Sequence, residues 1–169
     1  MPILVAAVLL LVAPPAAAQR LAGNVVPSAY SLWFAPDLAS ETFRGRAAID
    51  VRLVKPARSV TLHAAEIEFQ EVRIVAGTVS QTARVTVNAD DETATFTVPQ
   101  EMPAGPARIA VGYTGILNDK LRGFYVSRAN GRKYAVSQME ATDARRAFPS
   151  FDEPVYKATF DISLMIDEG

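Results

Sequence analysis

The sequence has no cysteine and only one histidine, His63, and this shortage removes several kinds of chemistry. Without cysteine, disulfide bonds and thiolate catalysis are excluded. One histidine is too few for a histidine-rich metal site. The zinc-helix motif H-E-x-x-H, the nucleophile elbow G-x-S-x-G and the phosphate loop G-x-x-x-x-G-K-[ST] are also absent. The chain as written therefore carries none of these catalytic or metal centres.

An excess of charge of either sign is missing as well. The 169 residues include 17 Lys and Arg against 18 Asp and Glu, which gives a net charge of −1. Such a balance gives no electrostatic reason to expect a nucleic acid or an anionic membrane as a partner. The length fits one globular domain.

The first residues have the pattern of a secretory signal peptide rather than of a folded element. Ile3–Val12 is apolar throughout, Pro14–Pro15 interrupts any helix, and Ala16–Ala18 provides the small residues of a cleavage site. An apolar core of about ten residues is too short for a transmembrane helix, which needs about 20. We therefore expect a signal peptide at residues 1–18, a mature domain at 19–169, and export to the periplasm or the cell exterior.

Beyond the signal segment, apolar and polar residues alternate with a period of two, which is typical of half-buried β-strands. Such runs include Tyr30 to Phe34, Phe43 to Leu53, Ile109 to Tyr113, and Tyr156 to Ile166. Turn residues separate the runs, and no stretch has a sustained helical stripe. The sequence therefore predicts an all-β fold, an antiparallel sandwich or saddle-shaped pair of sheets.

Four local features carry more specific expectations. Gly45, inside a long strand run, indicates a bulge or a bend. His63 is expected to be partly exposed on the polar face of its strand. Asn130-Gly131 lies between apolar runs and predicts a hairpin, with a loop that looks longer than two residues. The one candidate helical turn spans Thr142 to Phe148, with Thr142 or Asp143 as its N-cap.

Residues 137–154 crowd charged and aromatic residues and two prolines into a short stretch. If the strand from Tyr134 continues, Gln138 and Glu140 project from one face about 7 Å apart. A carboxylate beside an amide can bind a group with several N–H donors, such as an ammonium. The alternative, which the residues alone favour, is an exposed edge pair without a ligand.

The charges that follow suggest a self-locking loop. Arginines and carboxylates close together in a turn can form bidentate pairs, and Phe148 and Phe151 can anchor the turn in a core. From the residues alone, a pinned structural loop is favoured over an active site. The loop residues are Arg145, Arg146, Asp152 and Glu153.

The same segment resembles a known family. Residues 138–154 read QMEATDARRAFPSFDEP and resemble Q-x-E-x-T-D-A-R-x-x-F-P-C-F-D-E-P of the M1-family, aminopeptidase N-like zinc metallo-aminopeptidases. Residues 113–125 are similar to the family's Y-x-G-x-L-N-D-x-L-x-G-F-Y, and the resemblance covers residues 24–166. The main departure inside the motif is Ser150, which stands where the family has cysteine.

The resemblance implies an N-terminal β-saddle domain that packs over a thermolysin-like catalytic domain. It implies that Glu140 helps to bind the substrate's free α-amino group and that Gln138 contributes to the pocket for the first side chain. The residues that would support this pair are Asp143, Arg145, Arg146, Asp152 and Glu153. Peptides with a free N-terminus and a catalytic domain in the same polypeptide are the implied partners.

The chain stops at Gly169, before the family's G-x-M-E-N and H-E-x-x-H motifs and before the last strands of its N-terminal domain. We therefore expect the N-terminal piece of a longer exported aminopeptidase, without a metal site of its own and inactive alone. Zinc is implied only for the full-length family member. The alternative is a stand-alone β module that binds peptides or proteins without catalysis.

Overall fold

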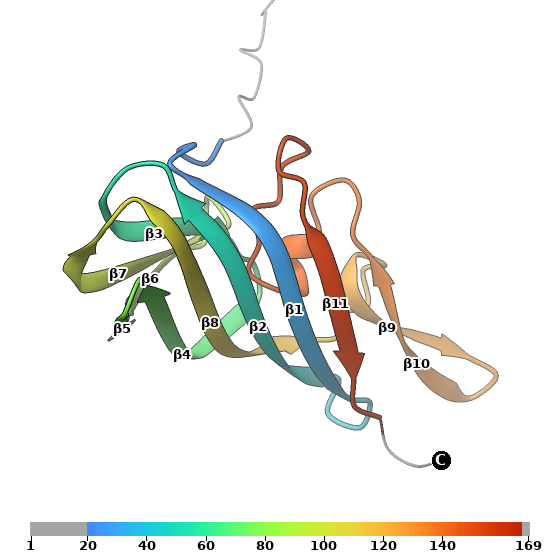
Figure 1. The fold of residues 1–169 in the computed structure, drawn as a ribbon. Helices are drawn as coiled ribbons and strands as arrows, with labels where there is room; N and C mark the ends of the chain where they lie inside the picture. The colour runs from blue at the N-terminus through green and yellow to red at the C-terminus, as the bar shows by residue number, and fades with distance from the viewer. Residues whose placement is uncertain (1–19, 167–169) are drawn as a thin grey trace, which may run out of the picture.

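The computed structural model describes residues 20–166, which form β-strands and a single 3-10 turn, η1 (Figure 1). The strands are β1 (Val25–Asp37), β2 (Thr42–Leu53), β3 (Ala57–His63), β4 (Ile67–Ala76), β5 (Val79–Thr82), β6 (Arg84–Asn88), β7 (Thr93–Met102), β8 (Gly105–Ile116), β9 (Gly123–Ala129), β10 (Arg132–Gln138) and β11 (Thr159–Leu164), and η1 is Ala144–Arg146. The expected signal segment, residues 1–18, lies outside the described residues.

The strands of residues 20–166 form three sheets. The largest has six strands in the order β11-β1-β2-β8-β4-β5, and the others are β3-β7-β6 and the hairpin β9-β10. In Figure 1 the six-stranded sheet forms the front layer, and the two smaller sheets lie behind it at opposite ends. All strand pairs are antiparallel except β1 with β11. The predicted all-β, sandwich-like fold is confirmed.

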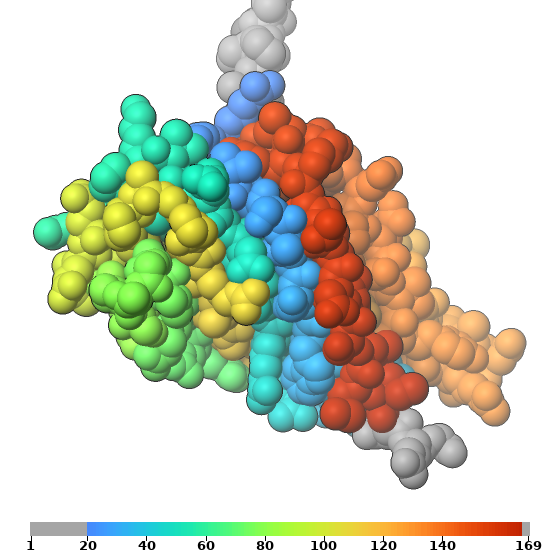
Figure 2. Space-filling view, viewed as in Figure 1, coloured from blue at the N-terminus to red at the C-terminus, as the bar shows by residue number. Residues whose placement is uncertain are grey.

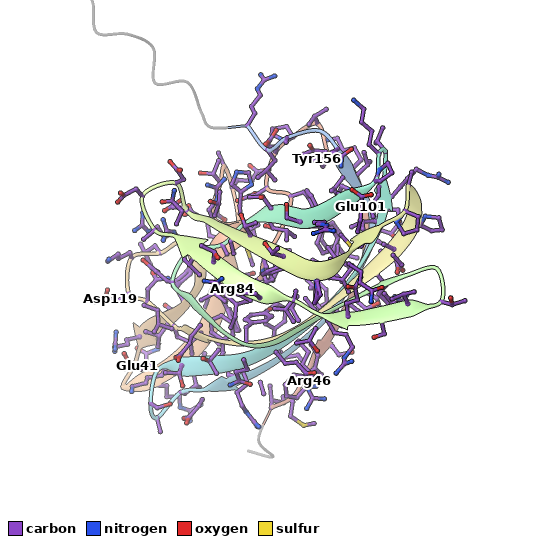
Figure 3. All side chains as sticks on the ribbon, turned by 90° about the vertical axis from the view of Figure 1, so that its left-hand side faces the viewer. Glu41, Arg46, Arg84, Glu101, Asp119 and Tyr156 are labelled. Carbon is purple, nitrogen blue, oxygen red and sulfur yellow. The ribbon has the colours of Figure 1, made fainter. Side chains whose placement is uncertain are left out.

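The core lies between the layers and follows the period-two pattern. Figure 3 shows how densely side chains occupy the interior. On β2 the odd-numbered positions are buried, while Arg44 and Arg46 point to the outer, exposed face. The inner faces meet through Tyr30, Leu32 and Phe34 of β1, Phe43, Ile49 and Leu53 of β2, Ile109 and Tyr113 of β8, Val60 and Leu62 of β3, and Phe96 and Val98 of β7.

Gly45 does not form the bulge or bend that its position suggests. Its strand pairs regularly on both sides, with Phe34 of β1 and with Tyr113 of β8. A Cβ atom at Gly45 would lie 2.2 Å from Cζ of Tyr113. The glycine therefore makes room for the buried aromatic ring of Tyr113, which any larger residue would displace.

The hairpin loop at Asn130-Gly131 is shorter than expected. Ala129 pairs directly with Arg132, so the loop has only two residues. Asn130 has φ 52° and Gly131 has φ 73°, as a type I′ turn requires. The Asn-Gly signal was right, and the estimate of a longer loop was wrong.

The last strand differs from the expectation in direction and in environment. β11 runs parallel to β1, with Tyr30 opposite Phe160 and Leu32 opposite Ile162. The apolar side chains share one face, as predicted, but Phe160 is 54% exposed and Ile162 is 62% exposed. Among the described residues β11 is an edge strand, and its apolar row is more than half exposed although the Phe160 ring stacks on Tyr30 at 4.8 Å.

Candidate functional site

The segment after β10 forms a turn rather than a longer strand. β10 ends at Gln138, which pairs with Gly123, and Glu140 to Asp143 form a turn that leads into η1. The expected strand continuation to Glu140 is therefore wrong. Gln138 and Glu140 are both exposed, but they do not stand as neighbours on one strand face.

Glu140 lines a cavity of about 330 Å³ between this turn and residues 148–160. The cavity walls combine aromatic rings with charged groups, and Gln138 is not among the residues that line it. The other lining residues include Tyr30, Phe148, Phe151, Tyr156, Phe160, Asp152, Glu153 and Lys157. A carboxylate beside such a partly apolar hollow can form charge-assisted hydrogen bonds with an ammonium group.

Arg145 ties the turn to two other parts of the chain. Its Nε lies 2.9 Å from Oδ2 of Asp152, and its Nη1 lies 3.2 Å from Oε2 of Glu92. Only 11% of the Arg145 side chain is exposed, so these ion pairs are shielded from solvent more than surface pairs are.

Arg146 is more deeply buried and holds three carboxylates. Its Nε lies 3.0 Å from Asp143, its Nη1 lies 3.0 Å from Glu66, and its Nη2 bonds to Glu92. Burial opposes the charge of Arg146, but the hydrogen bond to Asp143 and the charges of Glu92 and Glu66 outweigh it and raise the pKa of the guanidinium. Arg146 therefore stays charged and fixes the end of η1.

Arg145 and Arg146 form ion pairs with four carboxylates, and this group is called the arginine brace: Asp143, Asp152, Glu66 and Glu92. The sequence did not indicate the last two of them. Glu66 lies between β3 and β4, and Glu92 lies in the turn between β6 and β7. Both have left-handed backbones, with φ 57° and 50°, which is uncommon for residues other than glycine. No sequence signal marks them, because glutamates near turns are common and their arginine partners are more than 50 residues away.

Two of the expected support residues make contacts that the sequence did not indicate. Asp143 occupies the N-cap position of η1 but makes no capping hydrogen bond, because its carboxylate contacts Arg146 instead. Glu153 meets no arginine among the described residues. Its Oε1 accepts a hydrogen bond of 2.6 Å from the backbone N–H of Leu21, which fastens the segment before β1.

His63 is a buried anchor for this segment, so the prediction of a partly exposed histidine is wrong. Only 2% of it is exposed, and its Nδ1 accepts a hydrogen bond of 3.2 Å from the backbone N–H of Asp152. The backbones of His63 and Ser150 exchange hydrogen bonds of 2.8 and 3.0 Å. The Ser150 hydroxyl oxygen is buried and has no hydrogen-bond partner among the described residues.

Aromatic residues hold the same segment from the core side. The Tyr113 hydroxyl donates a hydrogen bond of 3.0 Å to the carbonyl of Ala147. The Tyr30 hydroxyl accepts a hydrogen bond of 3.1 Å from the N–H of Phe151. Burial raises the pKa of Tyr30 to about 12, so this phenol stays neutral at ordinary pH. Phe148 and Phe151 are buried, as expected of anchors.

Residues 20–166 contain neither a metal-binding cluster nor a membrane-spanning helix. Within that range, no three His, Cys, Asp or Glu side chains are placed to hold one metal ion. The zinc implied by the resemblance therefore finds no ligand set among these residues. Nor does the described part of the chain contain a helix of the length and hydropathy needed to cross a membrane.

Comparison with known proteins places this geometry in context. The chain is 39% identical over 155 residues to "Aminopeptidase 2" of Candida albicans, covering 89% of this chain and 16% of that protein. It is 37% identical over 156 residues to "Aminopeptidase M1" of Arabidopsis thaliana, covering 87% and 18%. It is 34% identical over 156 residues to "Puromycin-sensitive aminopeptidase" of Caenorhabditis elegans, covering 88% and 16%.

This chain thus spans less than a fifth of the length of these relatives. Residues 26–169 match the family described as the peptidase M1 N-terminal domain. The match includes the cavity, the turn with Glu140 and the complete arginine brace. The chain belongs to the peptidase M1 N-terminal domain family.

Proposed function

We propose that this domain is part of an exported zinc aminopeptidase that removes N-terminal residues from peptides, and that Glu140 binds the substrate's free α-amino group. The observation that supports the proposal is the position of Glu140. It is an exposed carboxylate at a cavity, on a turn that Arg145 and Arg146 tie to two other turns. A carboxylate needs such a fixed support to select a substrate by the place of its ammonium group.

The same role accounts for exopeptidase selectivity. When the substrate's ammonium group pairs with Glu140, the peptide bond that reaches the catalytic part lies at a fixed distance from the N-terminus. An internal peptide bond lacks that ammonium and leaves the carboxylate without a partner. Gln138, exposed at the end of β10, is proposed to contact the first side chain of the peptide from the rim of this region.

The catalytic part is proposed to lie in the same polypeptide, beyond the residues of this chain. The chain alone is then expected to bind no zinc and to hydrolyse no peptide. A metal assay and a peptidase assay on the purified chain check both expectations. Hydrolysis by the chain alone would contradict the proposed division of roles.

Replacing Glu140 with glutamine in the longer protein tests the anchoring role. A hydrogen bond to a charged group is worth about 1.5–3 kcal/mol, so kcat/KM for free peptides should fall about 10- to 100-fold. Zinc content should not change. Glu101→Gln removes the same charge from an exposed position at the end of β7 and serves as the control. Equal kinetics for the two variants would refute the role of Glu140.

Export is proposed from the N-terminal residues and needs its own experiment. N-terminal sequencing of the protein recovered outside the cytoplasm should give a chain that begins at Gln19. Recovery of protein with Met1 intact from the cytoplasm alone would refute export without touching the role of Glu140.

A further inference from the structure

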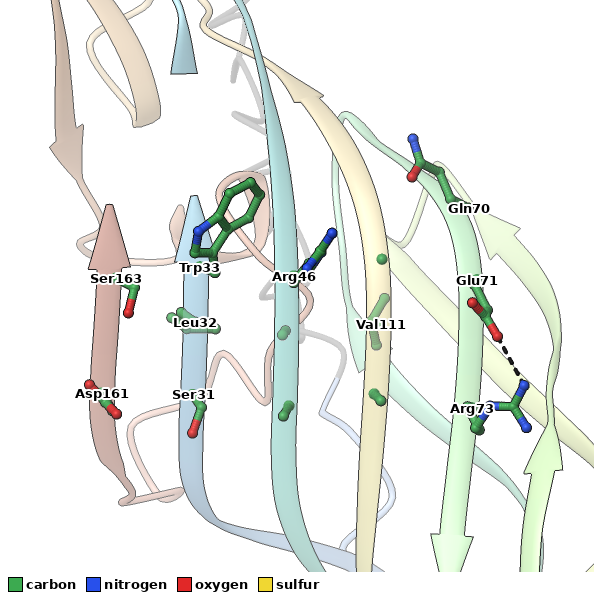
Figure 4. Close-up of a pocket in the computed structure, with 14 residues that line it drawn as sticks. Ser31, Leu32, Trp33, Arg46, Gln70, Glu71, Arg73, Val111, Asp161 and Ser163 are labelled. Atoms are coloured by element: carbon green, nitrogen blue, oxygen red, sulfur yellow. Dashed lines mark hydrogen bonds and ion pairs between the residues drawn. The ribbon is translucent and has the colours of Figure 1, made fainter. Parts of the chain in front are cut away.

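The outer face of the six-stranded sheet carries a second and larger hollow, of about 670 Å³ (Figure 4). Residues from five neighbouring strands line it: β11, β1, β2, β8 and β4. This is the sheet face in front in Figure 2, where β11, β1 and β2 run side by side. The hollow and the cavity at Glu140 have no lining residue in common.

No large side chain fills the floor of this outer hollow, because residues with small side chains lie opposite one another on adjacent strands. Ser31 of β1 pairs with Ala48 of β2, and Ala48 pairs with Ala110 of β8. Gly112, two residues along β8, extends the floor, and nothing lies within 4 Å of the position a Cβ there would take. Small residues alone do not make a site, so the surrounding side chains decide what the hollow can bind.

One wall presents a guanidinium held against an aromatic ring. Trp33 and Arg46 are cross-strand partners, and the Arg46 guanidinium lies 5.1 Å from the centre of the Trp33 ring (Figure 4). Arg46 forms no ion pair with any residue in the described range. An arginine stacked on a tryptophan keeps its N–H edge available for bidentate binding of a carboxylate.

The β11 side of the hollow presents the opposite charge. Asp161 lies beside Ser31, is exposed, and has no ion-pair partner among residues 20–166. At the β4 side, Glu71 and Arg73 neutralise each other at 3.1 Å. The lining residues thus leave one cation and one anion without protein partners: Arg46 and Asp161.

The separation of these two groups sets the size of a complementary ligand. Asp161 is level with Ala48, so it lies two strands across and two residues along the sheet from Arg46, which places the Cα atoms of Arg46 and Asp161 about 12 Å apart at usual sheet spacings. The Arg46 side chain points toward β8 rather than toward Asp161 (Figure 4), so it does not shorten that distance. Each charged group of a ligand lies about 3 Å from its protein partner, which takes up part of it. A ligand with an anion and a cation roughly 5–9 Å apart fits the remainder, and two to three extended residues cover that range.

We propose that the outer hollow binds a short peptide as a zwitterion, with its C-terminal carboxylate on Arg46 and its α-ammonium on Asp161. The bare floor leaves room for the peptide backbone and for small side chains. Because the two charged termini provide the recognition, the hollow accepts many sequences of the right length. This site is additional to the amine anchor proposed at Glu140.

The protein carries its own reporter for this binding. Trp33 is the only tryptophan of the chain, and it lies in the wall of the hollow. The full chain is titrated with trialanine, trialanine amide, N-acetyl-trialanine and acetate, and tryptophan fluorescence is followed. Trialanine should give a saturable change, while the amide and the N-acetyl peptide should bind about tenfold more weakly or worse. Acetate at the same concentrations should have no effect.

Variants assign each terminus of the peptide to its partner. Arg46→Gln should abolish the preference for the free acid over the amide, and Arg46→Lys should retain part of it. Asp161→Asn should abolish the preference for the free amine over the N-acetyl form. Arg52→Gln is the matched control, because Arg52 is an exposed arginine on the same strand, outside the lining of the hollow.

Four results would overturn the proposal. They are no fluorescence response to trialanine, an equal response to the acid and the amide, acetate binding as tight as the tripeptide, and equal behaviour of the Arg46→Gln and Arg52→Gln proteins. None of them bears on the role of Glu140, which is tested by kinetics in the longer protein.

Discussion

Replacing Gly45 with alanine is expected to destabilise the domain strongly, although alanine is normally preferred to glycine in a strand. The added Cβ would lie 2.2 Å from Cζ, 2.4 Å from Cε2 and 2.5 Å from the hydroxyl oxygen of Tyr113. Tyr113 is 1% exposed, and its ring packs edge-on against Phe43 at a centroid distance of 6.3 Å. The ring therefore has little space into which it can move.

Two costs add up in this variant. Overpacking a buried site costs about 1–3 kcal/mol. Displacing the ring also breaks the hydrogen bond from Tyr113 to Ala147 and leaves a buried carbonyl without a donor, at about 1–3 kcal/mol. The sum, about 2–6 kcal/mol, is a large part of the roughly 5–15 kcal/mol that stabilises a typical domain.

Urea unfolding followed by circular dichroism measures this loss as a lower midpoint at an unchanged slope. Gly112→Ala is the matched control, because Gly112 is also a sheet glycine but a Cβ there would meet nothing within 4 Å. Its stability should stay within about 1 kcal/mol of the parent chain. If the two alanine variants unfold at the same midpoint, the steric argument for Gly45 is refuted.

Three further predictions concern the segment behind the candidate site. Ser150→Ala should raise stability by about 1 kcal/mol in urea unfolding, because it removes a buried hydroxyl without a partner; a loss of stability would contradict this. Glu92→Gln should lower stability by about 1–3 kcal/mol, since buried Arg146 loses a carboxylate, whereas Glu101→Gln should change little; equal effects would show that the brace contributes nothing. Burial raises the pKa of Tyr30 from 10.0 to about 12, so its neutral form stabilises the fold below pH 10 and that stability is lost as pH rises toward 12. Tyrosinate absorbance and circular dichroism should therefore change together in that range, and ionisation of Tyr30 in a still-folded chain near pH 10 would refute this.

The strand pattern was predictable from the sequence because local alternation reports which face of a strand is buried. The run from Phe43 to Leu53 shows this clearly: its odd-numbered positions are buried and Arg44 and Arg46 are exposed. The anchoring role of Phe148 was also predictable from its neighbours along the chain. A large apolar ring in a segment rich in charged residues is expected to be buried in the core. These inferences need only the neighbours of each residue along the chain.

Pairings between distant strands could not be obtained in this way. Glu92 lies 53 residues from Arg145, and nothing in its neighbourhood distinguishes it from a solvated turn residue. The exposure of His63 was predicted wrongly because the segment that buries it, around Ser150, is distant in the sequence. The outer hollow depends on Ser31, Ala48 and Ala110 meeting side by side, which requires the strand order and the register.

The parallel pairing of the first and last strands has a consequence for the time course of folding. The Tyr30–Phe151 hydrogen bond joins positions 121 residues apart, and β11 follows even later in the chain. Tyr30 pairs with Phe160, 130 residues later, so at a synthesis rate of about 5–20 residues per second one edge of β1 stays unpaired for roughly 7–26 seconds after it emerges from the ribosome. Closing so long a loop also has a high entropic cost, so the domain should fold slowly. Its early folding intermediate exposes the unpaired β1 edge and should therefore be prone to aggregation. A chaperone bound to the β1 edge during synthesis would not shorten this delay. It would, however, keep the unpaired edge from associating with other chains until β11 has been synthesised.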